Sequence, residues 1–136
     1  MRGCLIVLAA AVCAFAADSD KVETLSGRLV LNAGKPPAMA VAGNKLVPLD
    51  GDDSTRKVLG DQRLNGFEVQ AKGHFTASGR FLIDPIHTTA LTVRKDGHLK
   101  TITYWCDVCG IRAYTPGPCV CCQKETTLDL IDPGAK

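Results

Sequence analysis

Four cysteines near the end of the chain stand in two CxxC pairs, a spacing that belongs to metal sites. The pairs are Cys106-x-x-Cys109 and Cys119-x-x-Cys122, with nine residues between them. Four thiolates at this spacing can reach the corners of a tetrahedron, which is how a structural Zn²⁺ is held in zinc ribbons and rubredoxin-like knuckles. Gly110 follows the first pair and tolerates the positive φ that a knuckle needs. The sequence therefore predicts a Zn²⁺ site formed by these four residues.

A fifth cysteine, Cys121, stands next to Cys122, so either residue could supply the fourth thiolate. We expect Cys122 to be the ligand, because the CxxC spacing then occurs in both knuckles. The spare thiol could instead recruit Cu(I), which prefers soft sulfur ligands. Cysteine also behaves as a small hydrophobic residue, and we favour a buried, structural Cys121 over a role in metal transfer.

The first residues of the chain carry the pattern of an export signal. Arg2 is followed by an apolar stretch over residues 4–12, and an Ala-Phe-Ala sequence at 14–16 places small residues where a signal peptidase reads them. We predict a signal peptide over residues 1–16 and a mature chain that is periplasmic or secreted. The apolar stretch is shorter than the roughly 20 residues of a membrane-spanning helix. No stable membrane span is therefore expected after cleavage.

The cysteines of the mature chain allow two interpretations of the tail. An exported protein meets an oxidising compartment, and two disulfides with one free thiol fit five cysteines as well as four metal ligands do. We expect Zn²⁺ rather than disulfides, because the spacing and the turn residues are those of knuckles. A thioredoxin-like pair at Cys106 and Cys109 is disfavoured, since its flanks are strand-like and Asp107 would raise the pKa of a neighbouring thiol.

Short strand-like segments flank both knuckles. They cover residues 103–105, 111–114 and 126–131, and a turn rich in Pro and Gly covers 115–118. This layout predicts a zinc-ribbon-like module over residues 104–131, followed by a flexible tail over 132–136. Such a module has almost no apolar core, so a bound metal would supply most of its folding free energy.

Residues 17–103 show the periodicity of one β-rich domain. Apolar and polar residues alternate with the period of two that half-buried strands require, while Asp53-Ser54 and Gly60 would begin and end a short helix. The order of three strands, one helix and two strands is that of an OB-fold barrel. The predicted strands cover residues 25–31, 38–42, 45–49, 67–75 and 80–83, and the predicted helix covers 55–59. We therefore predict a mainly β protein, an OB-like five-stranded barrel with one short helix, extended by a C-terminal zinc-ribbon-like β hairpin.

Two dipeptides predict tight hairpins. Gly43-Asn44 would join the second and third strands as a two-residue turn, and Asp96-Gly97 would place Val93 opposite Lys100. In the long strand 67–75, Phe67 and Phe75 would share the inward face.

The composition does not favour nucleic-acid binding. The formal net charge is +2, and Arg2 of the signal contributes to it. The sequence contains no basic cluster that would neutralise a phosphate backbone. Aromatic residues on the inward face could not form a stacking platform for bases. We therefore expect no nucleic-acid partner.

The residues that could catalyse a reaction are also sparse. His74, His87 and His98 are expected to be solvated surface residues, and the chain has no nucleophile elbow, HExxH, P-loop or GxGxxG pattern. The acidic cluster before the helix, Asp50 with Asp52-Asp53, lacks the final bidentate Glu of a Ca²⁺ loop. A helix cap with solvated neighbours explains it better, and we expect a protein that is not an enzyme.

The chain resembles a loose class of small exported bacterial proteins, mostly uncharacterised, that join an OB-like fold to a cysteine-rich tail. The resemblance is carried by the LVPLDGD stretch at 46–52, the GFEVQAKG strand at 66–73 and the cysteine-rich run at 104–122. It implies the fold and a metal site, and it implies no activity.

These observations together predict an exported, non-enzymatic binding or structural protein with a structural Cys₄ zinc site. The barrel remains open to a protein or small-molecule ligand. The alternative is a periplasmic metal-handling protein for Zn or Cu, or a thiol-redox protein, that uses the same cysteines.

Overall fold

One continuous β-sheet runs through residues 21–135, the part of the chain that this computed structural model describes. The signal peptide predicted for residues 1–16 lies outside the described residues. The strands of the described part are β1 (Glu23–Val30), β2 (Ala38–Val41), β3 (Lys45–Asp50), β4 (Glu68–Phe75), β5 (Phe81–Ile83), β6 (Leu91–Lys95), β7 (His98–Cys106), β8 (Ile111–Ala113) and β9 (Thr127–Ile131). Its helices are α1 (Asp53–Leu59), the 3₁₀ helix η1 (Gln62–Leu64) and α2 (His87–Ala90).

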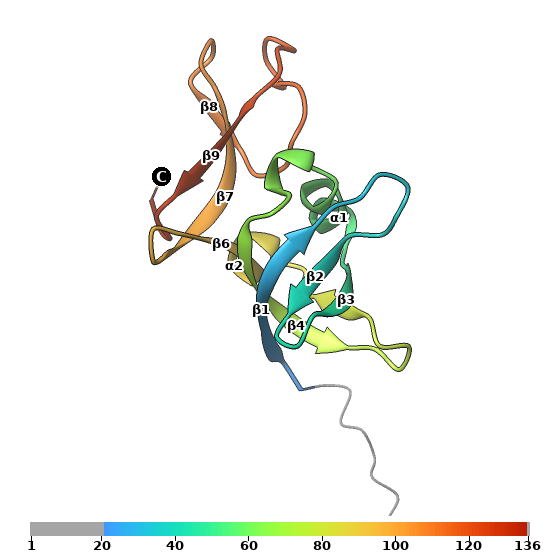
Figure 1. Cartoon of the computed structure of the whole chain (residues 1–136). Helices are drawn as coiled ribbons and strands as arrows, with labels where there is room; N and C mark the ends of the chain where they lie inside the picture. The colour runs from blue at the N-terminus through green and yellow to red at the C-terminus, as the bar shows by residue number, and fades with distance from the viewer. Residues whose placement is uncertain (1–20, 136) are drawn as a thin grey trace, which may run out of the picture.

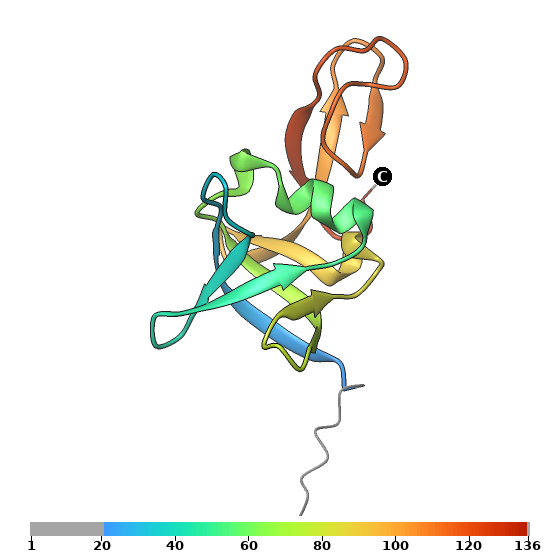
Figure 2. The same ribbon diagram turned by 90° about the vertical axis from the view of Figure 1, so that its right-hand side faces the viewer.

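Five strands close into a barrel in the order β1-β2-β3-β5-β4, and β4 returns to pair with β1. The neighbouring strands are antiparallel except β3 and β5, which are parallel. α1 lies across one end of this barrel (Figure 2). Within the described chain it is the one helix of seven residues or more. The prediction of a mainly β protein with an OB-like five-stranded barrel and one short helix is confirmed.

Alternating apolar residues of the barrel strands form one core. Leu29, Met39, Leu49 and Phe81 come from four different strands, and each is at most 1% exposed. α1 adds the buried Leu59 to the same cluster. A slip of one residue in any of these strands would turn its apolar side chains outward, so this core specifies the strand register.

The structure confirms one predicted hairpin and corrects the other. Asp96 and Gly97 have φ values of 52° and 78°, as a two-residue turn requires, and Val93 lies opposite Lys100 as predicted. The first hairpin pairs Val41 with Lys45, so three residues rather than two form its loop. The predicted register of β2 and β3 was therefore wrong by one residue.

The helix begins two residues earlier than the sequence predicted. Asp52 is the N-cap, and its Oδ1 accepts hydrogen bonds from Thr55 N at 2.9 Å and from Thr55 Oγ1 at 2.8 Å. Asp52, Asp53 and Ser54 are all residue types that can cap a helix. The helix begins after Asp52 because its carboxylate is the one that accepts from a free backbone N–H three residues ahead. Gly60 ends the helix as predicted, although with a φ of −83° it does not use the left-handed conformation.

The last residue of β4 lies on the predicted face but is only partly buried. Phe75 stands directly opposite the buried Phe81 of β5, packs on it edge to face at 5.1 Å between ring centroids, and is 37% exposed. Gly73 permits the close approach of β5, because a Cβ there would collide with the carbonyl oxygen of Leu82. β4 and β5 can therefore approach closely enough to close the barrel.

The sheet continues beyond the barrel along the edge of β4 that also carries β5. Residues 73–75 of β4 pair with β5, whereas residues 68–71 pair with β6. β6 forms a hairpin with β7, and β7 continues as the central strand of an extension, with β8 on one edge and β9 on the other. This extension projects away from the barrel (Figure 1). β7 runs through the boundary expected between residues 103 and 104, so the barrel and the extension share a strand.

The described part of the predicted tail forms a turn. Asp132 makes an ion pair with Lys100, and Ala135 N donates to Asp132 O at 3.0 Å. Across residues 21–135 the helices are all too short or too polar to cross a membrane.

Candidate metal centre

Four thiols meet at the tip of the extension. Their Sγ atoms all lie within 4.8 Å of one another, and the pair Cys106 and Cys122 is separated by 3.5 Å. A tetrahedral Zn²⁺ with Zn–S bonds of about 2.3 Å would place its sulfurs about 3.8 Å apart, whereas a disulfide needs about 2.05 Å. All cysteines of the described chain are free. We call this group the cysteine cluster; it consists of Cys106, Cys109, Cys119 and Cys122.

The first knuckle is the turn between β7 and β8. Gly110 has a φ of 63°, and its N–H donates to Cys106 O at 2.9 Å. The backbone N–H of Cys109 points at Cys106 Sγ, with 3.5 Å between the two atoms. The end of a strand therefore presents one sulfur, and the turn brings the second sulfur back beside it.

The second knuckle repeats this geometry inside the loop that joins β8 to β9. Gln123 has a φ of 61°, and its N–H donates to Cys119 O at 2.9 Å. Cys119 N donates to Lys124 O at 2.8 Å, which brings the two sides of this loop together. A left-handed Gln is uncommon, so the residue type of Gln123 does not indicate that it is the counterpart of Gly110. Its position directly after a CxxC pair is the signal that could have identified it.

Backbone N–H groups lower the pKa of one cluster thiol, whereas a neighbouring thiol raises the pKa of another. The N–H groups of Cys122 and Cys121 point toward Cys119 and lower the pKa of that thiol to about 7. The pKa of Cys109 is raised, first by the adjacent Cys121 thiol and then by burial. Crowded thiolates repel one another, so the cluster cannot carry four negative charges without a cation. A bound divalent metal would compensate these charges and keep the thiols deprotonated.

Cys121 lies outside the cluster and is exposed to solvent. The expectation that it is a buried small hydrophobic residue was wrong. The CxxC spacing leaves the two residues between its cysteines at the outer surface of the knuckle, and the thiol of Cys121 still lies beside Cys109. Val120, the other residue between Cys119 and Cys122, is 84% exposed for the same reason.

A partly buried polar network braces the strands that carry the knuckles. Arg112 Nη1 donates to Thr103 Oγ1 and to Asp129 Oδ2, each at 2.7 Å, and Thr103 Oγ1 donates to Asp129 O at 2.6 Å. The guanidinium of Arg112 also lies 4.9 Å from the ring centroid of Trp105. One side chain from β8 thus connects β7 to β9. No pattern in the sequence indicates this network, because it joins residues of three different strands.

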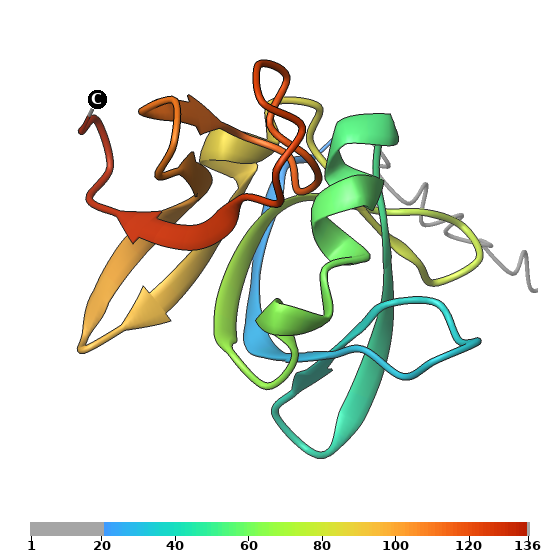
Figure 3. The ribbon, with the colours of Figure 1, turned by 90° about the horizontal axis from the view of Figure 1, so that it is seen from above.

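Arg63 fastens the second knuckle loop to the barrel. Its Nη1 donates to Thr126 O at 2.9 Å, its Nε lies 2.9 Å from Asp61 Oδ1, and its guanidinium is 5.3 Å from the ring centroid of Tyr104. Figure 3 shows this loop running close to the helical segment that contains α1 and η1. Tyr104 is fully buried under the Arg63 guanidinium. Its burial, together with the charge of Asp61, raises the pKa of Tyr104. The extension therefore has a fixed position on the barrel.

The acidic residues and one histidine considered in the sequence serve the fold. Asp52 caps α1, and Asp50 accepts a hydrogen bond from Arg56 Nε at 2.9 Å, which lowers the pKa of Asp50. His87 Nε2 donates to Tyr114 O at 2.8 Å, a second contact between the barrel and the extension.

Comparisons of the chain with protein-family models, with curated proteins and with solved structures find no match.

Proposed function

We propose that this chain is an exported, non-enzymatic protein whose C-terminal extension holds a structural Zn²⁺ through the cysteine cluster. The observation that carries the proposal is the convergence of four thiols within 4.8 Å at the ends of two matching knuckles. Zn²⁺ is the metal that four cysteines at CxxC spacing most commonly hold. Export is inferred from the signal pattern of residues 1–16, and the resemblance to small exported proteins with cysteine-rich tails agrees with it.

A structural role suits the cluster because the protein would fill all four positions around the metal. Catalytic zinc keeps one position open for water or substrate, and structural zinc does not. The knuckles also lack a core of their own. Among the residues from 105 to 126, those buried are Cys106, Cys119 and Thr126, whereas Val108 is 61% exposed. A metal would take the place of the missing apolar core.

A second candidate function is metal handling or thiol redox chemistry, and the exposed Cys121 favours it. The thiol of Cys121 lies next to Cys109 and is accessible from solvent. A trafficking protein needs such an accessible ligand, because metal is passed on by exchange of one thiolate for another.

Native mass spectrometry and thiol counting test the proposal on the mature chain. The proposal predicts one Zn²⁺ per chain, and five alkylatable thiols once the metal is released. Disulfides would instead leave one alkylatable thiol and lower the mass by about two daltons for each bridge. That second result would refute the zinc site.

The rate of zinc transfer to a chelator separates the two candidate functions. A structural site should release zinc slowly, and Cys121→Ser should change neither the stoichiometry nor the rate. A fast release that slows at least tenfold in Cys121→Ser would favour metal handling. Cys122→Ser is the matched variant, and it should lose stoichiometric zinc.

A further inference from the structure

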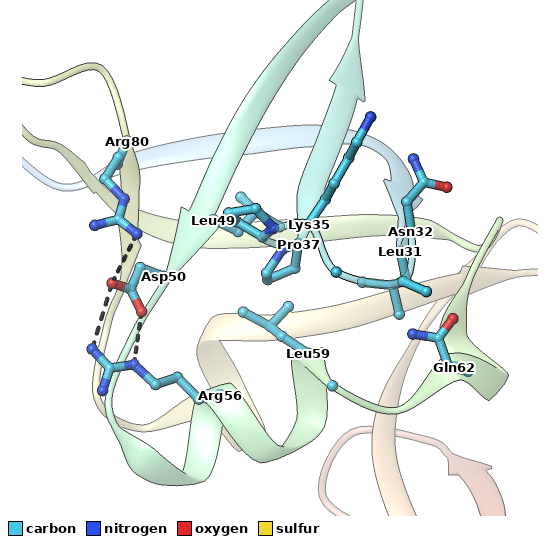
Figure 4. Close-up of a pocket in the computed structure, with 14 residues that line it drawn as sticks. Leu31, Asn32, Lys35, Pro37, Leu49, Asp50, Arg56, Leu59, Gln62 and Arg80 are labelled. Atoms are coloured by element: carbon cyan, nitrogen blue, oxygen red, sulfur yellow. Dashed lines mark hydrogen bonds and ion pairs between the residues drawn. The ribbon is translucent and has the colours of Figure 1, made fainter.

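A cavity of about 310 Å³ opens at one end of the barrel, far from the cysteines in the sequence. It lies between the loop that joins β1 to β2, the end of β3 and the helix α1 (Figure 4). Leu31, Leu49 and Leu59 line it, and each is at most 6% exposed. The floor of the cavity is thus continuous with the barrel core, and the more exposed Pro36 and Pro37 supply apolar surface that a ligand can reach.

Two arginines at one side of the cavity share a single carboxylate. Asp50 lies between them, with Oδ1 2.9 Å from Arg56 Nε and Oδ2 3.6 Å from Arg80 Nη2. Figure 4 shows both guanidinium groups turned toward this carboxylate. Arg56 Nη1 also lies 3.7 Å from Asp53, whose side chain is 95% exposed and therefore well solvated. Each arginine keeps N–H groups that Asp50 does not engage, because a guanidinium carries five donors.

The lining residues carry an excess of positive charge. They include three cations, Arg56, Arg80 and Lys35, and one anion, Asp50. Lys35 extends away from Leu59, whereas both arginines turn toward Asp50 (Figure 4). Arginine recognises carboxylates through paired N–H donors in a planar fork. A cavity with such donors beside leucines suits a ligand with a negatively charged head and a hydrocarbon body.

We propose that this cavity binds a small organic monocarboxylate. Its carboxylate would contact Arg56 and Arg80, and its hydrocarbon body would lie against Pro36 and Pro37, above the buried Leu49 and Leu59. Its volume of about 310 Å³ lies in the lower part of the range typical of small-ligand pockets, which suits a ligand no larger than a medium-chain fatty acid. The proposal goes beyond the metal site and does not depend on it.

An NMR titration of the zinc-loaded mature chain with octanoate tests this proposal. We expect saturable shifts at the amides of residues 31–35, 56–62 and 80, which surround the cavity. Octanamide has the same chain without the charge and should bind at least tenfold more weakly, and octylammonium should bind no better than octanamide. Shifts elsewhere, or equal binding of the three probes, would overturn the proposal.

Charge-removing variants locate the carboxylate. Arg80→Gln and Arg56→Gln should each weaken octanoate binding about tenfold. Arg94→Gln is the matched control, because Arg94 is an exposed arginine of β6 outside the cavity and its loss should change nothing. If Arg80→Gln does not fold, Arg56→Gln carries the test alone, since 60% of that side chain is exposed. Unchanged affinity in a folded Arg56→Gln variant would place the carboxylate elsewhere and contradict the proposal.

Discussion

The barrel and the extension belong to one sheet, but they are stabilised by different means. The barrel buries leucine, valine and aromatic side chains from five strands and a helix. In the extension, Tyr104 is the last residue of β7 that belongs to this core, and the knuckles beyond it bury Cys106, Cys119 and Thr126. A short β-segment without its own core needs another source of free energy. In this protein we assign that role to a metal at the tip and to polar braces along the strands.

Loss of one cluster cysteine should have the largest effect. Cys106→Ser removes a metal ligand that is also buried, and we expect it to abolish stoichiometric zinc binding and to unfold residues 106–126. Native mass spectrometry and amide dispersion of these residues measure the change. Cys121→Ser is the control and should retain both zinc and dispersion. Full metal binding by Cys106→Ser would show that the knuckle assignment is wrong.

Truncation in the barrel core should be the next largest effect. Phe81 is fully buried, so Phe81→Ala should lower the free energy of unfolding by about 3–5 kcal/mol. Phe75 is its edge-to-face partner but is 37% exposed, and Phe75→Ala should cost about 1 kcal/mol. Urea unfolding measures both values. Equal costs would contradict the difference in burial between the two rings.

Removal of the polar brace should weaken the extension without affecting the barrel. Arg112→Gln breaks charge-assisted hydrogen bonds to Thr103 and Asp129, which corresponds to about 1–3 kcal/mol. Hydrogen exchange at β8 and β9 should speed up accordingly, while the amides of β1 to β5 stay protected. The fluorescence of Trp105, the single tryptophan, should also change because Arg112 lies over its ring. An equal loss of hydrogen-exchange protection in the barrel would show that the barrel and the extension do not unfold independently.

The smallest effect concerns the helix cap. The Thr55 N–H and hydroxyl lower the pKa of Asp52 from 3.8. Because the pKa is lower in the folded state, this carboxylate stabilises α1 above pH 3.8, and the contribution is lost as the pH falls through the folded pKa. A side-chain ¹³C titration should place the midpoint below 3.8. Asp52→Asn keeps an acceptor for the cap and should remove the part of the pH dependence of α1 stability that Asp52 contributes. A midpoint at or above 3.8 would rule out the cap.

Local patterns predicted the features that depend on neighbours in sequence. The period of two located the barrel strands, and Asp96-Gly97 specified its hairpin because both residues accept a positive φ. The hairpin at Gly43-Asn44 failed because pairing ends at Val41, one residue earlier than the dipeptide indicated. Two short helices, η1 and α2, escaped prediction because segments of three and four residues carry no clear periodicity.

The cluster itself could be anticipated, whereas its supports could not. CxxC spacing alone pointed to the cysteines that the structure brings together. The contact between Arg63 and Thr126 spans 63 residues, and the brace of Arg112 depends on which strands flank β7. Contacts of this kind follow from tertiary placement, which no local pattern encodes.

Zinc removal followed by NMR tests the central claim most directly. The ¹⁵N-labelled mature chain is recorded with zinc, after chelation under reducing conditions, and after one equivalent of zinc is restored. We predict that the amides of residues 106–126 collapse to random-coil positions without metal, that those of β1 to β5 stay dispersed, and that zinc reverses the change. Knuckle amides that keep their positions without metal, or a barrel that unfolds together with the knuckles, would contradict this account.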